Sequence, residues 1–238
     1  MIRNPLNTEE LFGAYDKGAD VRKSLGRLGD PRLLRPVLTW NLPALVTRHP
    51  VEGFPHPFVV CPGAGECAKW CYARVGHFIR PAVSAKHEYC LALTRAPEFE
   101  ERIIAAIKGK PFVRIHSSGE FYDPQYFERW LRICTQLRGQ TIFWCYTKMI
   151  QMVRDFHDLI PDNLNIIFST GGKHDELIDF DRDRHTRVFP AGTTRGEVVK
   201  TGYAYCSNDD LIHICLRGAR KIGLVAHGQK MRLVREPV

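Results

Sequence analysis

Three cysteines in one short run are the residues of this chain best suited to chemistry. Cys61 and Cys67 enclose a segment with two glycines and a proline, and Cys71 follows after Ala-Lys-Trp. Glycine lets such a loop wrap closely, so that several thiolates can face one centre while backbone N–H groups stay free to donate to sulfur. We therefore predict that Cys61, Cys67 and Cys71 bind a metal centre, with an iron–sulfur cluster as the leading interpretation.

Zinc is the competing metal. Cys3His zinc sites are common, and His77 follows six residues after Cys71. Structural zinc sites usually pair their cysteines as Cys-x2-4-Cys, a range that only the Cys67–Cys71 spacing fits. Cys206 and Cys215 are additional ligand candidates, for a second metal or as a fourth ligand of the first centre. Plain burial of these two cysteines is the alternative that stays open.

The number of protein ligands decides the chemistry of such a cluster. Three thiolates leave one iron of a [4Fe–4S] cluster open, and S-adenosylmethionine can chelate this iron through its amino and carboxylate groups. Electron transfer then cleaves the sulfonium and gives a 5′-deoxyadenosyl radical, which is cofactor chemistry that the protein positions. A fourth protein ligand would remove the open iron and would leave an electron carrier or a structural cluster.

The composition is that of an ordinary globular protein. Hydrophobic residues make up 44% and charged residues 25% of the 238 residues, which excludes disordered and collagen-like classes. No apolar stretch is long enough to cross a bilayer, and the N-terminus lacks a signal-peptide core, so we expect a cytoplasmic protein without a membrane partner. Its eight cysteines should therefore stay reduced. The net charge of +8 suits either a nucleic-acid partner or a solvated basic surface.

Alternating strands and helices must position the cysteines. We expect strands at Pro57–Cys61, Phe112–His116, Thr141–Thr147, Asn165–Thr170, Arg187–Phe189 and Ile222–Ala226. Helical patterns lie between them, at Val83–Leu93 continuing through Pro97–Ile107, at Gln125–Leu137 and at Ile150–Leu159. This order predicts an α/β fold with a parallel sheet, either an open sheet or a partial (β/α) barrel, whose reactive groups lie at the C-terminal strand ends.

The chain shows no linker, so we predict a single domain over residues 1–238. Residues 1–50 are rich in proline and arginine and are expected to form an extended lead-in with one short helix near Glu9 to Tyr15. Residues 51–238 should form the partial barrel, and the cysteine run should begin where its first strand ends. Cys90, Cys134 and Cys145 have apolar neighbours and are expected in the core.

Polar residues follow three of the expected strands and are candidates for holding a cofactor. They are Ser118, Gly119 and Glu120 after the second strand, Thr147 and Lys148 after the third, and Ser169 and Thr170 after the fourth. Backbone carbonyls and the Glu120 carboxylate could receive an amino group, and the hydroxyls could meet a ribose. We further expect one of Arg114 and His116 to face the barrel interior. The sequence does not identify a catalytic residue.

Two of these motifs resemble the radical S-adenosylmethionine superfamily. Cys67-x3-Cys71, with Trp70 before the last cysteine, is similar to the cysteine loop of that superfamily, and Ser118-Gly119-Glu120 is similar to its Gly-Gly-Glu strand motif. The spacing differs, because the usual loop is Cys-x3-Cys-x2-Cys and Ser118 replaces the first glycine. The resemblance implies a (β/α)6 partial barrel with a [4Fe–4S] cluster at its mouth, S-adenosylmethionine as cofactor and an electron donor as partner.

Five blocks, two of which include the motifs above, resemble a family of phage proteins, the gene product 88 family. The blocks are Thr39–Ala44, Cys61–Ala73, Ser118–Phe121, Tyr146–Lys148 and Val225–Gly228. This resemblance implies a phage or prophage origin, and hence the cytoplasm of the host. Our leading hypothesis is an iron–sulfur enzyme of the radical S-adenosylmethionine type, acting on a substrate that the sequence does not identify. The alternatives are a zinc- or cluster-stabilised module that binds nucleic acid and an iron–sulfur electron carrier.

Overall fold

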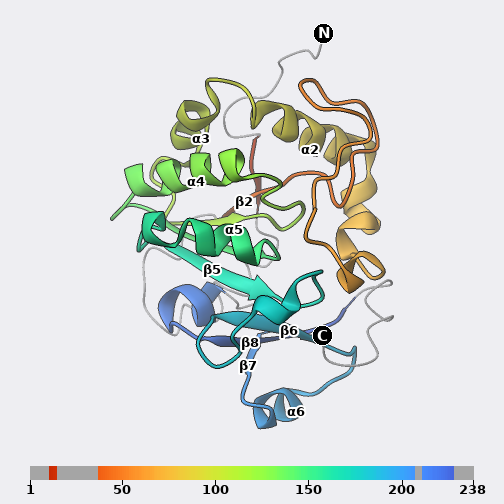
Figure 1. Cartoon of the computed structure of the whole chain (residues 1–238), viewed down its shortest axis with the longest axis vertical. Helices are drawn as coiled ribbons and strands as arrows, with labels where there is room; N and C mark the ends of the chain where they lie inside the picture. Colours follow the sequence, from red (N-terminus) through yellow and green to blue (C-terminus); the bar gives the residue numbers. More distant parts are fainter. Residues whose placement is uncertain (1–10, 15–36, 207–210, 228–238) are drawn as a thin grey trace.

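A parallel β-sheet forms the centre of the molecule. The computed structural model describes residues 11–14, 37–206 and 211–227 (Figure 1). The strands of the sheet are β1 (Gly13–Ala14), β2 (Leu38–Trp40), β3 (Phe112–Ile115), β4 (Ile142–Thr147), β5 (Leu164–Ser169), β6 (His185–Phe189), β7 (Ala204–Cys206) and β8 (Lys221–Val225). Their order is β1-β2-β3-β4-β5-β6-β8-β7. Only β1, among these strands, pairs in antiparallel fashion, and the sheet is not closed.

This arrangement confirms the predicted fold class, an α/β protein with a parallel sheet that is compatible with a partial barrel. The helices are α2 (Pro81–Leu93), α3 (Phe99–Ile107), α4 (Pro124–Gln136), α5 (Ile150–Asp155) and α6 (Arg195–Lys200). The first four lie within one or two residues of the predicted start positions. No helix within the described ranges is long and apolar enough to cross a membrane.

One predicted strand is wrong. Pro57–Cys61 forms no strand and makes only an isolated antiparallel bridge, between Val59 and Val46. Pro55 and Pro57 have no N–H group for a ladder, and Val59 is 55% exposed, so this apolar run is not a sheet interior. The strand beside β3 is β2 instead, which lies within the segment expected to be a lead-in.

The helix expected near Glu9 to Tyr15 is also wrong where it can be assessed. Residues 11–14 include strand β1, whose Gly13 pairs with Thr39 of β2; the other positions of that prediction lie outside the described residues. The predictions also missed β7, which has only three residues. Such a short strand carries too few residues for an alternating pattern to be recognised.

The two faces of the sheet bury different clusters. Helices α2 to α5 pack on one face, against side chains such as Val113, Phe143 and Cys145. On the opposite face, Phe112 and Trp144 pack against a π-helical turn, Ile212–Leu216. Side chains alternate along a strand, so the face that carries Phe112 and Trp144 continues to the C-terminal ends of the strands. A polar site lies at that edge of the sheet.

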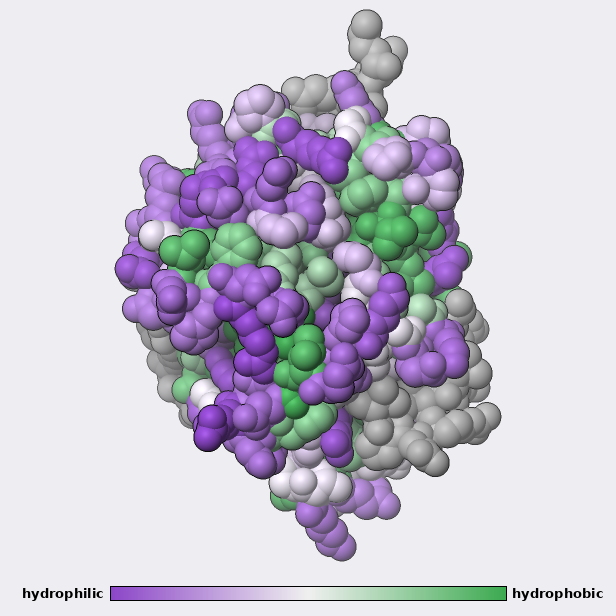
Figure 2. Space-filling view, viewed as in Figure 1, coloured by the Kyte–Doolittle hydropathy of each residue, from purple (hydrophilic) through white to green (hydrophobic). Residues whose placement is uncertain are grey.

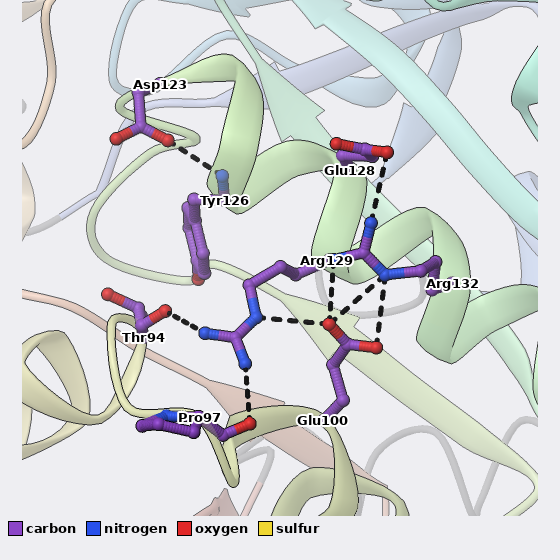
Figure 3. Close-up of polar contacts among 8 residues, drawn as sticks. All are labelled: Thr94, Pro97, Glu100, Asp123, Tyr126, Glu128, Arg129 and Arg132. Carbon is purple, nitrogen blue, oxygen red and sulfur yellow. Dashed lines mark hydrogen bonds and ion pairs between the residues drawn. The ribbon is translucent and has the colours of Figure 1, made fainter.

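A charged network joins α3 to α4 on the helical face. Glu100 accepts hydrogen bonds from Arg129 and Arg132, at 3.1 and 2.8 Å, and Arg132 also pairs with Glu128. The Arg129 guanidinium donates further to the carbonyls of Thr94 and Pro97, which precede α3 (Figure 3). These contacts fix the end of α2 and the start of α3 against α4. The surface above these helices is largely hydrophilic (Figure 2).

Candidate functional site

A cavity of about 630 Å³ opens at the C-terminal edge of the sheet. Its wall includes the three cysteines Cys61, Cys67 and Cys71, together with Glu120 and Lys148. These residues come from the loop before α2 and from the ends of β3 and β4. Strand ends of a parallel sheet meet at one edge, and this is where binding sites of α/β folds usually lie.

The cysteine loop is attached by backbone contacts to the turn that follows β5. The Cys67 N–H donates to the Gly171 carbonyl at 2.9 Å, and the Lys173 N–H donates to the Gly63 carbonyl at 3.0 Å. A Cβ at Gly65 would lie 2.5 Å from the Gly172 carbonyl oxygen, closer than real Cβ contacts allow. The loop therefore requires glycine where it approaches the neighbouring backbone. The loop sequence alone does not show this contact.

The thiols of the three cysteines share one environment. The Leu45 N–H donates to Cys61 Sγ at 3.3 Å. Burial raises the pKa of the Cys61 thiol, and Glu120, Cys71 and Cys67 raise it further through their charges. Burial also raises the pKa of Cys71, which the Lys148 ammonium partly opposes.

The predicted Ser118-Gly119-Glu120 turn is held mainly by structural contacts. The Ser118 hydroxyl donates to the Leu42 carbonyl at 2.9 Å, and the Leu42 N–H donates to the Ser118 carbonyl at 2.9 Å. Gly119 has φ +88° and would place a Cβ 2.5 Å from Leu42 Cβ, so this position requires glycine. Ser118, Gly119 and Glu120 all line the cavity, as the sequence suggested.

Asn41 supports the same turn and was not among the predicted site residues. Its Oδ1 accepts hydrogen bonds from the N–H groups of Ser117 and Ser118, at 2.8 and 3.1 Å. Tyr72, one residue after the last cysteine of the loop, donates its hydroxyl to the Ser117 carbonyl. Asn41 and Tyr72 both line the cavity, and they connect β2, the cysteine loop and the end of β3.

Glu120 is a buried carboxylate that joins two strand ends. Its Oε1 accepts from the Phe121 N–H at 2.8 Å and from the Thr147 hydroxyl at 2.9 Å, and its Oε2 accepts from the Lys148 N–H at 2.9 Å. Burial raises the pKa of Glu120, whereas these hydrogen bonds lower it. A carboxylate offers about four acceptor positions, so Glu120 can accept one more donor from the cavity.

The remaining predicted cofactor residues divide into two groups. Lys148 and Ser169 line the cavity, where the Lys148 ammonium donates to the Ser169 hydroxyl at 2.8 Å. Thr147 and Thr170 are buried and do not line it: Thr147 donates to Glu120, and Thr170 donates to the Thr186 carbonyl. Adjacent residues of a strand face opposite sides, which explains this division.

The other cysteines are also divided. Cys206, at the end of β7, lines the cavity and contacts the Ala204 carbonyl at 3.6 Å, whereas Cys215 does not line it. Cys90, Cys134 and Cys145 are buried, which confirms their predicted place in the core. Among the residues that the structure describes, no three His, Cys, Asp or Glu side chains lie close enough together to hold one metal ion.

Arg114 and His116 both line the cavity. Arg114 lies in β3, whereas His116 follows the last residue of that strand, Ile115, so strand alternation does not decide the direction of its ring. The His116 ring packs against Phe121 and Tyr126. His116 has a left-handed φ of 65°, and its Nε2 lies 2.9 Å from the Tyr126 hydroxyl. Burial and the neighbouring Arg114 lower the pKa of His116 to about 3, so the ring is neutral. Non-glycine residues in this backbone conformation are concentrated at functional sites.

Comparisons with known proteins identify the family. The family described as "Gene product 88" matches residues 16–232. The chain is 25% identical to the Gene 88 protein of Mycobacterium phage L5 over 190 residues, which cover 71% of this chain and 79% of that protein. It is 24% identical to the Gene 88 protein of Mycobacterium phage D29 over 191 residues, with the same coverage. No solved structure matches the chain significantly. The protein therefore belongs to the gene product 88 family, whose relatives named here are phage proteins.

Proposed function

We propose that this protein binds a [4Fe–4S] cluster through Cys61, Cys67 and Cys71 and is an enzyme of the radical S-adenosylmethionine type. The observation that carries the proposal is that three thiols of one loop line one cavity, beside the buried carboxylate of Glu120. When bound, such a cluster supplies the electron that cleaves S-adenosylmethionine reductively. An external electron donor is then a required partner.

The donor set fits a cluster better than a single ion. Thiolates are the usual ligands of iron–sulfur clusters, and backbone N–H groups such as that of Leu45, which points at Cys61 Sγ, tune them. Zinc is the competing metal, but structural zinc sites usually pair their cysteines as Cys-x2-4-Cys, a range that only the Cys67–Cys71 spacing fits.

Glu120 and Lys148 give the cavity a way to hold an amino acid group. Glu120 retains one acceptor position for an ammonium. The Lys148 ammonium donates to the neutral Ser169 hydroxyl, and no ion pair joins it to a carboxylate of the described residues, so it can meet an anionic group. The cavity volume of about 630 Å³ lies within the range of small-molecule sites. Asn41 and Tyr72 would keep the wall of this site fixed.

Metal analysis of the anaerobically purified and reconstituted protein tests the proposal. We expect iron and sulfide in equal amounts, about four of each per chain as in a [4Fe–4S] cluster. Replacing Cys61, Cys67 and Cys71 by serine should abolish iron binding. Cys90→Ser is the matched control, because Cys90 is buried in the core and its contact with the Leu11 carbonyl can be kept by a hydroxyl. Stoichiometric zinc in place of iron would refute the cluster.

The reaction is tested separately from the cluster. Reduction with dithionite in the presence of S-adenosylmethionine should release 5′-deoxyadenosine, and a verified cluster that releases none would refute the radical mechanism. An iron–sulfur electron carrier is the second candidate, and the observation that favours it is Cys206, a fourth cysteine on the cavity wall. In that case Cys206→Ala should destabilise the cluster, and Cys215→Ala, which alters a cysteine outside the cavity wall, should not.

A further inference from the structure

The rim of the cavity is basic and aromatic. Residues 67–87 contain four lysines or arginines and three large aromatic residues but no aspartate or glutamate. The basic residues are Lys69, Arg74, Arg80 and Lys86, and the aromatic ones are Trp70, Tyr72 and Phe78. The segment begins within a 3-10 helix, Glu66–Ala68, forms two more at Tyr72–Arg74 and Gly76–Ile79, and then enters α2. A basic segment with interleaved aromatic rings is typical of surfaces that bind single-stranded nucleic acid.

The aromatic rings of this segment gather at the cavity mouth. Tyr72, His77 and Phe78 all line the cavity. The Tyr72 and Phe78 rings lie 5.6 Å apart edge to face, and the His77 and Phe78 rings lie 4.1 Å apart. Tyr72 is 39% exposed, and Ile79 is 42% exposed, so this part of the surface is unusually apolar.

The guanidinium groups lie outside this ring cluster. Arg74 ends the 3-10 helix that begins at Tyr72, and Arg80 precedes α2; both are exposed and neither lines the cavity. Neither forms an ion pair with any residue that the structure describes, in contrast to Lys69, which pairs with Glu66 at 2.8 Å. Phosphates and bases alternate along a single-stranded nucleic acid. Two cations that have no acidic partner among the described residues, beside exposed rings, could contact such a strand.

We propose that the rim formed by residues 67–87 binds a single-stranded nucleic acid, which is the substrate class of this cavity. Bases stack on Tyr72 and Phe78, and backbone phosphates contact Arg74 and Arg80. This inference rests on the proposed function, because it names what the cluster-containing cavity acts on. The positive net charge of +8 favours an anionic partner of this kind.

Binding of labelled oligonucleotides to the full chain tests this inference. The probes are a single strand of about 12 nucleotides as DNA, the same strand as RNA, a DNA strand of equal length without bases, and polyglutamate of equal charge. We expect the strands with bases to bind more tightly than the abasic strand and polyglutamate. Comparing the affinities for the DNA strand and the RNA strand shows which of the two nucleic acids the rim binds.

Two variants and one matched control locate the contact. Arg74→Ala with Arg80→Ala should weaken binding and lower the slope of log affinity against log salt by roughly 1.4, the value for two lost single-strand phosphate contacts. Lys108→Ala with Arg217→Ala removes two exposed cations near the opposite edge of the sheet and should leave that slope unchanged. Tyr72→Leu should weaken the base-containing strand by about fivefold or more and should not weaken the abasic strand to that extent.

The outcomes separate this inference from the proposed function. Equal binding of abasic and base-containing strands, or an equal loss in both double variants, overturns the inference. Iron and sulfide are measured on the same preparation. A verified cluster without strand binding overturns the inference and leaves the proposed function, whereas strand binding without a cluster overturns the proposed function. Circular dichroism of each variant checks that a loss of binding is not a loss of folding.

Discussion

Replacing Gly65 by alanine should detach the cysteine loop from the sheet. The added Cβ would lie 2.5 Å from the Gly172 carbonyl oxygen and 2.6 Å from its carbon, whereas ordinary contacts begin at 3.4 Å. Both partners are backbone, so the loop must move by about 1 Å, and overpacking of this kind costs about 1–3 kcal/mol. The movement also strains the hydrogen bond from the Cys67 N–H to the Gly171 carbonyl.

Thermal unfolding of the metal-free protein and iron content after reconstitution measure this effect. A loss of about 2 kcal/mol corresponds to a melting temperature lower by roughly 4–8 °C for a chain of this size. Gly196→Ala is the matched control, because a Cβ at Gly196 in α6 meets no atom within 4 Å. That change should be neutral or stabilise by up to about 1 kcal/mol. Equal melting temperatures and iron contents for the two variants would refute the reasoning.

Two further substitutions test the supports of the fold and the site. Hydrogen bonds from Arg132 and then Arg129 lower the pKa of Glu100, so its stabilising contribution is present above the unfolded-state pKa and is lost as the pH falls through the folded-state value. Glu100→Gln should therefore cost about 1 kcal/mol at neutral pH and little in acid by chemical denaturation, and an equal loss at both pH values would contradict this. Asn41→Ala leaves two N–H groups without an acceptor and should lower the free energy of unfolding by about 2–3 kcal/mol, measured by thermal unfolding. Asn41→Asp keeps the acceptor and should cost less. Equal losses in the two variants would exclude the hydrogen-bond explanation.

The parts of the fold that could be predicted from sequence are those with local signals. Helix α4 is an example: Asp123 caps its first turn, Pro124 is its first residue, and its apolar residues recur with helical spacing. Strands β3, β4 and β5 are mostly apolar runs of the kind that a parallel sheet buries on both faces. In contrast, β2 is a three-residue strand within a proline-rich segment, and only its pairing with β3 defines it.

The site follows the same distinction between local and distant contacts. The prediction placed Cys61, Cys67 and Cys71 at one centre because their spacing is short, and the three do line one cavity. The spacing could not show that Gly65 meets Gly172 or that Asn41 supports Ser118, since these partners are more than seventy residues apart in the chain. The aromatic residues of the rim were visible in the sequence, but only the structure shows that Trp70, Tyr72 and Phe78 line one cavity.

The turn after β3 limits how a cofactor could be held. The Ser118 hydroxyl already donates to Leu42, and three of the roughly four acceptor positions of Glu120 are filled. An amino group could therefore take only the last position on Glu120 or a backbone carbonyl of the turn. A ligand that brings one ammonium and one carboxylate suits this wall, because Lys148 lies beside Glu120 and can bind the carboxylate. A ligand with several cationic groups does not suit it, since the other charged side chains on the cavity wall, Arg114 and Lys86, are also basic.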